Sequence, residues 1–218
     1  GGEASHVSPG LSVARQLSRR LPEAIITFSG PSSSAQRHRI RSAGFRYLGI
    51  PSRPAPKNPA QALRFVTDNF AGSCAAKWNL REQDVSLVVG LGSYDSSTMV
   101  KAAIRKGTPV VLLEQDLMPE TLTQSHSGRS ALVCTAFEQT KPHLHVQSRS
   151  LCAGFPVSPS FEQLHRDRVE GHRASCSAHG SLPRNTKTKR LVVLGGVGGS
   201  QALNKVVGVI SHQAVGTK

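Results

Sequence analysis

One histidine and one acidic segment stand where α/β proteins place reactive groups. His6 closes the glycine-containing opening GGEASH, and Glu114, Gln115 and Asp116 follow the apolar run 110–113. Ligand clefts of open α/β folds form at the carboxyl edge of a parallel sheet, and we expect both segments there. His6 is therefore a candidate general base, although a single histidine is more often structural. The acidic segment is a candidate for orienting substrate hydroxyls.

A glycine-rich turn late in the sequence is a second candidate site. In LVVLGGVGGSQALN, residues 191–204, aliphatic residues lead into Gly195, Gly196, Gly198 and Gly199, and a helix-compatible stretch follows. A strand, a tight turn and a helix N-terminus in this order build a phosphate cradle. The turn lacks both the dinucleotide fingerprint G-x-G-x-x-G and the Lys-Ser/Thr pair of a P-loop. It is either a diphosphate-binding loop or a structural turn, and GLGSYDSS at 90–97 is a weaker signal of the same kind.

Other catalytic and metal-binding patterns are missing from the sequence. The sequence shows no Ser-His-Asp arrangement with the spacing of a known family and no paired-carboxylate motif. The four cysteines, Cys74, Cys134, Cys152 and Cys176, show no C-x-x-C pair and no metal-ligand spacing with the histidines. We therefore predict reduced thiols, no metal and no cofactor.

Charge and composition limit the partners. Lys and Arg number 27 against 13 Asp and Glu, a formal net charge of +14. This imbalance favours an anionic partner such as nucleic acid, an acidic membrane surface or a phosphorylated substrate, or it is simply a solvated basic surface. No apolar run reaches the roughly 20 residues of a transmembrane helix. Few aromatics, 5% of the residues, and no nucleic-acid-binding motif argue against DNA or RNA.

The elements that must position these residues alternate between strands and helices. Apolar residues at Leu11, Val13, Ala14, Leu17 and Leu21 predict an amphipathic helix. Strands are predicted at 24–30 and 45–52, and a helix at 58–83, interrupted near its glycine at 72. A strand–helix–strand unit follows at 85–116: strand 87–89, a helix capped at 96–97 and ending at 106, and strand 110–113. Such a unit implies an α/β fold with a parallel sheet.

A polar segment divides the chain. Residues 148–190 are rich in Ser, Pro, Gly, His and Arg and show little apolar periodicity after Leu164. We predict an N-terminal Rossmann-like domain at 1–153, a linker and loosely ordered insert at 154–190, and the start of a second Rossmann-like domain at 191–218. Because the sequence opens with Gly1 and stops soon after its second glycine loop, we interpret it as lacking its first strand and the rest of its second domain.

Seven stretches in a fixed order resemble one enzyme family. They are GGEASHVSPGLSVARQL, RSAGFRYLGIPSR, VVGLGSYDSSTMVKAA, TPVVLLEQDLMPE, CTAFEQT, GFPVS and VLGGVGGSQALN. Their succession resembles the MurG family, which transfers N-acetylglucosamine from UDP-N-acetylglucosamine to undecaprenyl-pyrophosphoryl-N-acetylmuramyl pentapeptide. The resemblance covers most of the chain and is weakest at 162–189.

The resemblance implies a GT-B fold, with two Rossmann-like domains facing across a cleft, and a role in peptidoglycan biosynthesis, cell shape and cell division. The implied partners are UDP-N-acetylglucosamine, the lipid-linked muramyl pentapeptide and the anionic inner-membrane surface. It also implies peripheral attachment at the cytoplasmic face of the bacterial inner membrane, where about 1 kcal/mol per near-surface Lys or Arg suffices for localisation.

The resemblance also assigns residues. His6 is the implied catalytic base. The implied substrate-binding positions are Glu3, Ala4, Ser5, Gly92, Tyr94, Glu114, Gln115, Asp116, Ser158, Gly195, Gly196, Val197 and Gly199.

Several of these positions depart from the family pattern. GGTGGH becomes GGEASH, which adds the Glu3 carboxylate near a diphosphate, and EQN becomes EQD, with Asp116 replacing an amide. GNPVR becomes GFPVS, so that Ser158 replaces a phosphate-facing Arg, and GGSQGA becomes GGVGGS, with Val197 replacing a hydroxyl. In a desolvated site, loss of a charge-assisted phosphate contact weakens binding of the diphosphate by roughly a few kcal/mol. We predict an impaired or inactive transferase, with a non-catalytic module that docks to a membrane or partner as the alternative.

Overall fold

The computed structural model describes residues 6–31, 34–51, 58, 62–169, 201, 203 and 205–207. Contacts divide the chain into two compact units, one of residues 2–159 and one formed mainly by residues 160–218. The predicted domain bounds at 153 and 190 remain a prediction. Predictions that concern Glu3, Ala4, Ser5 and the glycine loop at 195–199 lie outside the described residues.

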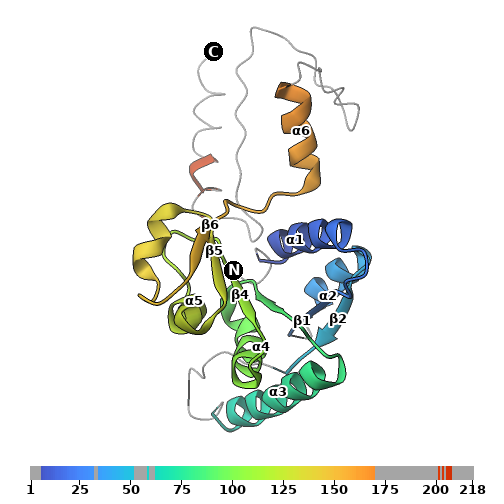
Figure 1. Ribbon diagram of the computed structural model, residues 1–218, viewed down its shortest axis with the longest axis vertical. Coiled ribbons are helices and arrows are strands. Elements are labelled where there is room, and N and C mark those ends of the chain that lie inside the picture. Colours follow the sequence, from blue (N-terminus) through green and yellow to red (C-terminus); the bar gives the residue numbers. More distant parts are fainter. Residues whose placement is uncertain are drawn as a thin grey trace. The chain divides into compact units, whose positions relative to one another are not determined.

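The first unit alternates helices and strands (Figure 1). Its elements are α1 (Val7–Arg20), β1 (Thr27–Gly30), α2 (Ser34–Ser42), β2 (Arg46–Gly49), α3 (Ala62–Glu82), β3 (Val88–Gly90), α4 (Ser93–Lys106), β4 (Val110–Glu114), α5 (Thr121–His126), the 3-10 turn η2 (Ser127–Arg129), β5 (Leu132–Thr135), the 3-10 turn η3 (Glu138–His143) and β6 (Ser150–Cys152).

Every described strand pairing is parallel. β1 pairs with β2, and β3, β4, β5 and β6 form a four-stranded sheet in that order. Parallel neighbours need a crossover, and helices or 3-10 turns make each crossover between the paired strands. The predicted α/β class with a parallel sheet is confirmed.

One apolar core joins the four-stranded sheet to α3 and α4. Leu80 of α3, Val100 of α4, Leu112 of β4 and Val133 of β5 are buried in it. Figure 1 shows α3 and α4 side by side, and small residues such as Ala76 belong to this core. Because the core fixes α4 against β3 and β4, it also fixes the turns at the carboxyl ends of those strands.

A second apolar cluster anchors α1. Val7 and Leu11 of α1 pack with Ile40 of α2 and Tyr47 of β2, while Arg19 and Arg20 stay exposed. This arrangement confirms the predicted amphipathic helix, whose apolar face is the buried one.

Two helices differ from the predictions. The helix of the strand–helix–strand unit begins at Ser93, directly after Gly92, so the cap predicted at Ser96 and Ser97 is wrong. Gly92 has a φ of 81°, a conformation that glycine adopts without strain, and this lets the turn enter the helix early. The break predicted near Gly72 is also wrong, because helix α3 is continuous there, and the glycine lies against the carbonyl oxygen of Pro51.

A helix also lies within the predicted linker. Helix α6 (Pro159–Val169) begins at a proline, which is favourable in a first helical turn. One turn apart on this helix, Oε2 of Glu162 lies 4.0 Å from Nη2 of Arg166. Local signals therefore suffice for a helix in a segment with little apolar periodicity. Among the described residues, no helix is both long and apolar enough to cross a membrane.

Candidate functional site

Three segments meet at the carboxyl edge of the four-stranded sheet. They are the start of α1, the turn that follows β3 and the loop that follows β4. At Gly10, the helix α1 lies so close to Leu91 that an added Cβ would overlap the leucine side chain. This close approach of α1 to the β3–α4 turn places the residue that precedes the helix, His6, beside Gly92.

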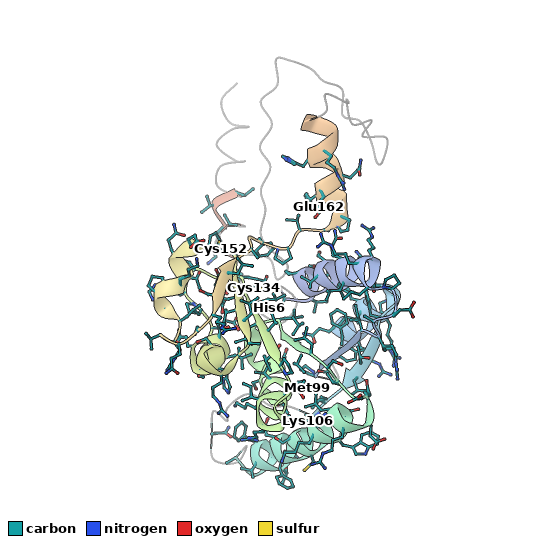
Figure 2. The ribbon with its side chains drawn as sticks, viewed as in Figure 1. His6, Met99, Lys106, Cys134, Cys152 and Glu162 are labelled. Carbon is teal, nitrogen blue, oxygen red and sulfur yellow. The ribbon has the colours of Figure 1, made fainter. Side chains whose placement is uncertain are left out.

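His6 contacts a carboxylate. Its Nε2 atom lies 3.4 Å from Oε1 of Glu120, and the two side chains are 13% and 31% exposed. Because a carboxylate can only accept, we assign the tautomer that carries the proton on Nε2. The Nδ1 atom is buried and has no hydrogen-bond partner among the described residues, so its lone pair is unused. Figure 2 labels His6 in the first unit.

Gly92 borders both members of this pair. A Cβ at Gly92 would lie 3.5 Å from Nδ1 and Cε1 of His6 and 3.5 Å from Oε2 of Glu120. The glycine has a positive φ and is buried. Gly92 was predicted to belong to the site. The structure places it next to His6.

Glu114 organises the loop that carries Glu120. It ends β4, is 3% exposed, and its two carboxylate oxygens accept the backbone N–H groups of Asp116 and Glu120, both at 3.0 Å. Charge-assisted bonds of this kind are the stronger ones in proteins. The carboxylate thus fixes the loop from 115 to 120, and its direct contact with a substrate stays a prediction.

Gln115 and Asp116 occupy the same loop. Nε2 of Gln115 is buried and has no hydrogen-bond partner among the described residues, which leaves two donors for a ligand. Asp116 is exposed, and its backbone carbonyl accepts the hydroxyl of Thr140 at 3.1 Å. Their predicted roles in substrate binding remain predictions.

The remaining predicted positions are less defined. Ser158 is half-buried in the segment between β6 and α6. Tyr94 lies in the first turn of α4, and its side chain is outside the described residues. The candidate site in the first unit therefore consists of His6, Gly92 and the loop from Glu114 to Glu120.

Sequence reasoning missed Glu120. The stretch LMPE at 117–120 was available, but a carboxylate six residues beyond a strand end has no periodic signal. Glu120 reaches His6 because Glu114 holds the backbone of Glu120. These contacts form only in the folded chain and leave no pattern in the sequence.

The arrangement suits proton abstraction. A histidine whose Nε2–H points to a carboxylate can accept a proton at Nδ1, and the carboxylate stabilises the resulting imidazolium. Among the described residues, no group of three or more His, Cys, Asp or Glu side chains could hold a metal ion.

Comparison with known proteins gives one consistent set of relatives. No family model matches the chain. The chain is 29% identical over 218 residues to the UDP-N-acetylglucosamine–N-acetylmuramyl-(pentapeptide) pyrophosphoryl-undecaprenol N-acetylglucosamine transferase of Clavibacter sepedonicus, covering 100% of the chain and 57% of the relative. The transferase of that name from Leifsonia xyli is 30% identical over 209 residues, which are 95% of the chain and 55% of the relative. The chain thus spans about half the length of the curated relatives it matches.

A solved structure shows the same fold. The crystal structure of Acinetobacter baumannii MurG aligns with a TM-score of 0.57 and 20% identity, covering 71% of this chain and 43% of that one. The parallel-sheet fold predicted from the sequence is therefore shared with a solved protein.

Proposed function

We propose that this chain, a homologue of the MurG transferases along its whole length, carries the acceptor side of an N-acetylglucosaminyl transfer in peptidoglycan synthesis. The observation that supports this proposal is the pair of His6 and Glu120 beside Gly92 at the carboxyl edge of the sheet. Such edges hold ligands in open α/β folds, and the pair supplies a base there.

The proposed reaction places the proton on His6. The C4 hydroxyl of the muramyl acceptor gives its proton to Nδ1, and its oxygen forms a bond to the anomeric carbon of UDP-N-acetylglucosamine. The bond from that carbon to the diphosphate oxygen breaks, and its electron pair leaves with UDP, so the configuration inverts. Glu120 stabilises the imidazolium through Nε2, as the acidic member of a catalytic triad does.

We further propose that the donor binds weakly. Ser158 offers at most a neutral hydrogen bond where the resemblance implies an Arg facing the diphosphate, and Glu3 adds a negative charge. Both changes act against a dianionic ligand. The chain by itself is therefore expected to transfer little or no sugar.

Titration calorimetry tests this proposal with two ligands. One is a short-chain, water-soluble muramyl pentapeptide diphosphate, and the other is UDP-N-acetylglucosamine. Binding of the first without heat from the second at millimolar concentration supports an acceptor-side role with an impaired donor site. Micromolar binding of UDP-N-acetylglucosamine contradicts the weak-donor proposal, and no binding of the acceptor analogue contradicts the function itself.

We propose in addition that α3 docks the chain to an anionic membrane surface. Val66, Phe70 and Trp78 recur at intervals of four or eight residues along this helix and are 61%, 71% and 62% exposed. The net charge of +14 favours an anionic surface, and Arg64, Lys77 and Arg81 of the same helix are exposed. This would localise the chain at the cytoplasmic face of the inner membrane as a peripheral protein.

Sedimentation with vesicles separates docking from catalysis. Vesicles that contain anionic lipid are expected to bind the chain, less so at high salt, and His6→Ala is expected to leave this binding unchanged. Equal binding to neutral vesicles would contradict the electrostatic part of the proposal.

A further inference from the structure

A groove of about 540 Å³ lies beside the candidate base, between α4 and the loop and helix that follow β4. Its volume is within the range of roughly 300–1,000 Å³ that accommodates a small ligand. The lining residues are Ser97, Lys101, Pro119, Glu120, Thr121, Leu122, Ser125 and His126. The described elements that form it all belong to the first unit.

The groove begins at the residue that contacts His6. Glu120 lines it, and Oε1 of the same side chain lies 3.4 Å from Nε2 of His6. When the reacting hydroxyl of a ligand lies at His6, substituents on the neighbouring carbon of that ligand can therefore reach this groove.

The chemistry of the groove favours a single negative charge flanked by amides. Lys101, on α4, brings a positive charge. The hydroxyls of Ser97 and Thr121 line the groove as donors and acceptors, and Leu122 adds an apolar surface. The Glu120 carboxylate in the same wall repels a multiply charged anion such as a diphosphate more strongly than it repels a singly charged carboxylate.

His126 adds a hydrogen-bond acceptor to the groove. Its Nδ1 atom lies 3.2 Å from the carbonyl oxygen of Leu122, and burial, together with the nearby charges of Lys101 and Arg129, lowers its pKa. With Nδ1–H directed to that carbonyl, Nε2 of the neutral ring is left as an acceptor. A ligand N–H, such as a peptide amide, matches this acceptor.

We propose that this groove binds the peptide of the muramyl acceptor, with Lys101 pairing with one of its carboxylates. The inference rests on the proposed function. On a muramyl sugar the lactyl ether that carries the peptide is on C3, next to the reacting C4 hydroxyl. A hydroxyl held at His6 thus directs the peptide toward the groove that Glu120 borders.

The test compares two soluble acceptor analogues by calorimetry. One is a short-chain muramyl pentapeptide diphosphate, and the other is the same compound with its lactyl group capped as a methylamide and no peptide. The chain is expected to bind the peptide-bearing compound about tenfold more tightly, as suits one charge-assisted contact. Lys101→Met is expected to remove this preference and leave the affinity for the peptide-free compound unchanged.

Two further variants make the outcome specific. Lys101→Arg keeps the charge and is expected to keep the preference, and Lys77→Met on α3 removes one charge elsewhere and is expected to change nothing. Circular dichroism checks that each variant folds.

Three results would overturn the inference. If Lys101→Met weakens both compounds equally, the lysine binds the diphosphate. If it weakens neither, the peptide lies elsewhere, while the proposed function stands. If the unaltered chain binds neither compound, the proposed function fails together with the inference.

Discussion

Nε2 of His6 lies 3.4 Å from Oε1 of Glu120, two residues that are 114 positions apart in sequence. The backbone N–H of Glu120 is in turn held by Oε2 of Glu114 at the end of β4. The histidine is thus positioned from two sides, by the start of α1 and by a loop that a buried carboxylate fixes. A side chain positioned in this way needs no further ordering when a ligand arrives.

Glu114→Ala is expected to destabilise the first unit by about 2 kcal/mol, because two backbone N–H groups lose their acceptor. Chemical denaturation followed by circular dichroism measures this change. Glu138→Ala, which removes an exposed carboxylate paired with Lys141, is the control and is expected to leave the free energy of unfolding nearly unchanged. Equal effects of the two substitutions would contradict the role assigned to Glu114.

Gly72→Ala is expected to destabilise the chain, although alanine is the better helix former by about 1 kcal/mol. An added Cβ would overlap the carbonyl oxygen of Pro51, and overpacking against a backbone costs roughly 1–3 kcal/mol. The control is Cys74→Ala on the exposed side of the same helix. A higher Tm for Gly72→Ala would show that the loop at Pro51 moves away freely.

The difference at Gly72 illustrates what the sequence could predict. Periodicity predicted α1 and the β3–α4–β4 unit because a single helix face, or a short aliphatic run, is buried in each. A glycine within a helical pattern signals either a break or a close approach, and only the position of Pro51 decides between them. Helix α2 was not predicted either, because its sequence SAQRHRIRS is mostly polar. Only the folded chain shows that Ile40 is buried.

The candidate site was predictable in part, for a similar reason. His6 and Glu114 stand next to glycine or aliphatic signals that mark a sheet edge, whereas Glu120 depends on hydrogen bonds to a loop backbone. Loop geometry of this kind follows no period. The strands β5 and β6, four and three residues long, were likewise missed.

Tyr47 is expected to ionise only in strong alkali. Burial, reinforced by the negative charge of Asp95, raises its pKa to about 12, and its hydroxyl donates to the carbonyl of Pro31. Because the folded pKa exceeds the unfolded value of 10.0, this contribution to stability is complete below pH 10 and is lost as the pH rises toward 12. Denaturation across pH 9–12 should show a decline that Tyr47→Phe reduces. An unchanged decline in the variant would assign it to other groups.

Trp78 offers a direct signal of membrane docking. It is the only tryptophan of the sequence and is 62% exposed on α3. Vesicles that contain anionic lipid are expected to shift its emission to shorter wavelengths as the indole leaves water. Phe70→Ser should weaken the binding several-fold, since it removes an apolar side chain from the same stripe. Leu117→Ser, at an exposed leucine outside α3, is the control, and an equal loss there would contradict docking through α3.

Ser158→Arg is expected to restore part of the donor affinity. If a serine replaces a diphosphate-facing guanidinium, as the weak-donor proposal holds, returning the cation should tighten binding of UDP-N-acetylglucosamine about tenfold or more. Titration calorimetry measures the difference, and Gln147→Arg, at an exposed position, controls for the added charge alone. A gain limited to Ser158→Arg would mean that the donor diphosphate approaches the segment between β6 and α6. Equal gains in both variants would reflect only the larger positive charge, and no gain in either would mean that Ser158 does not limit donor binding.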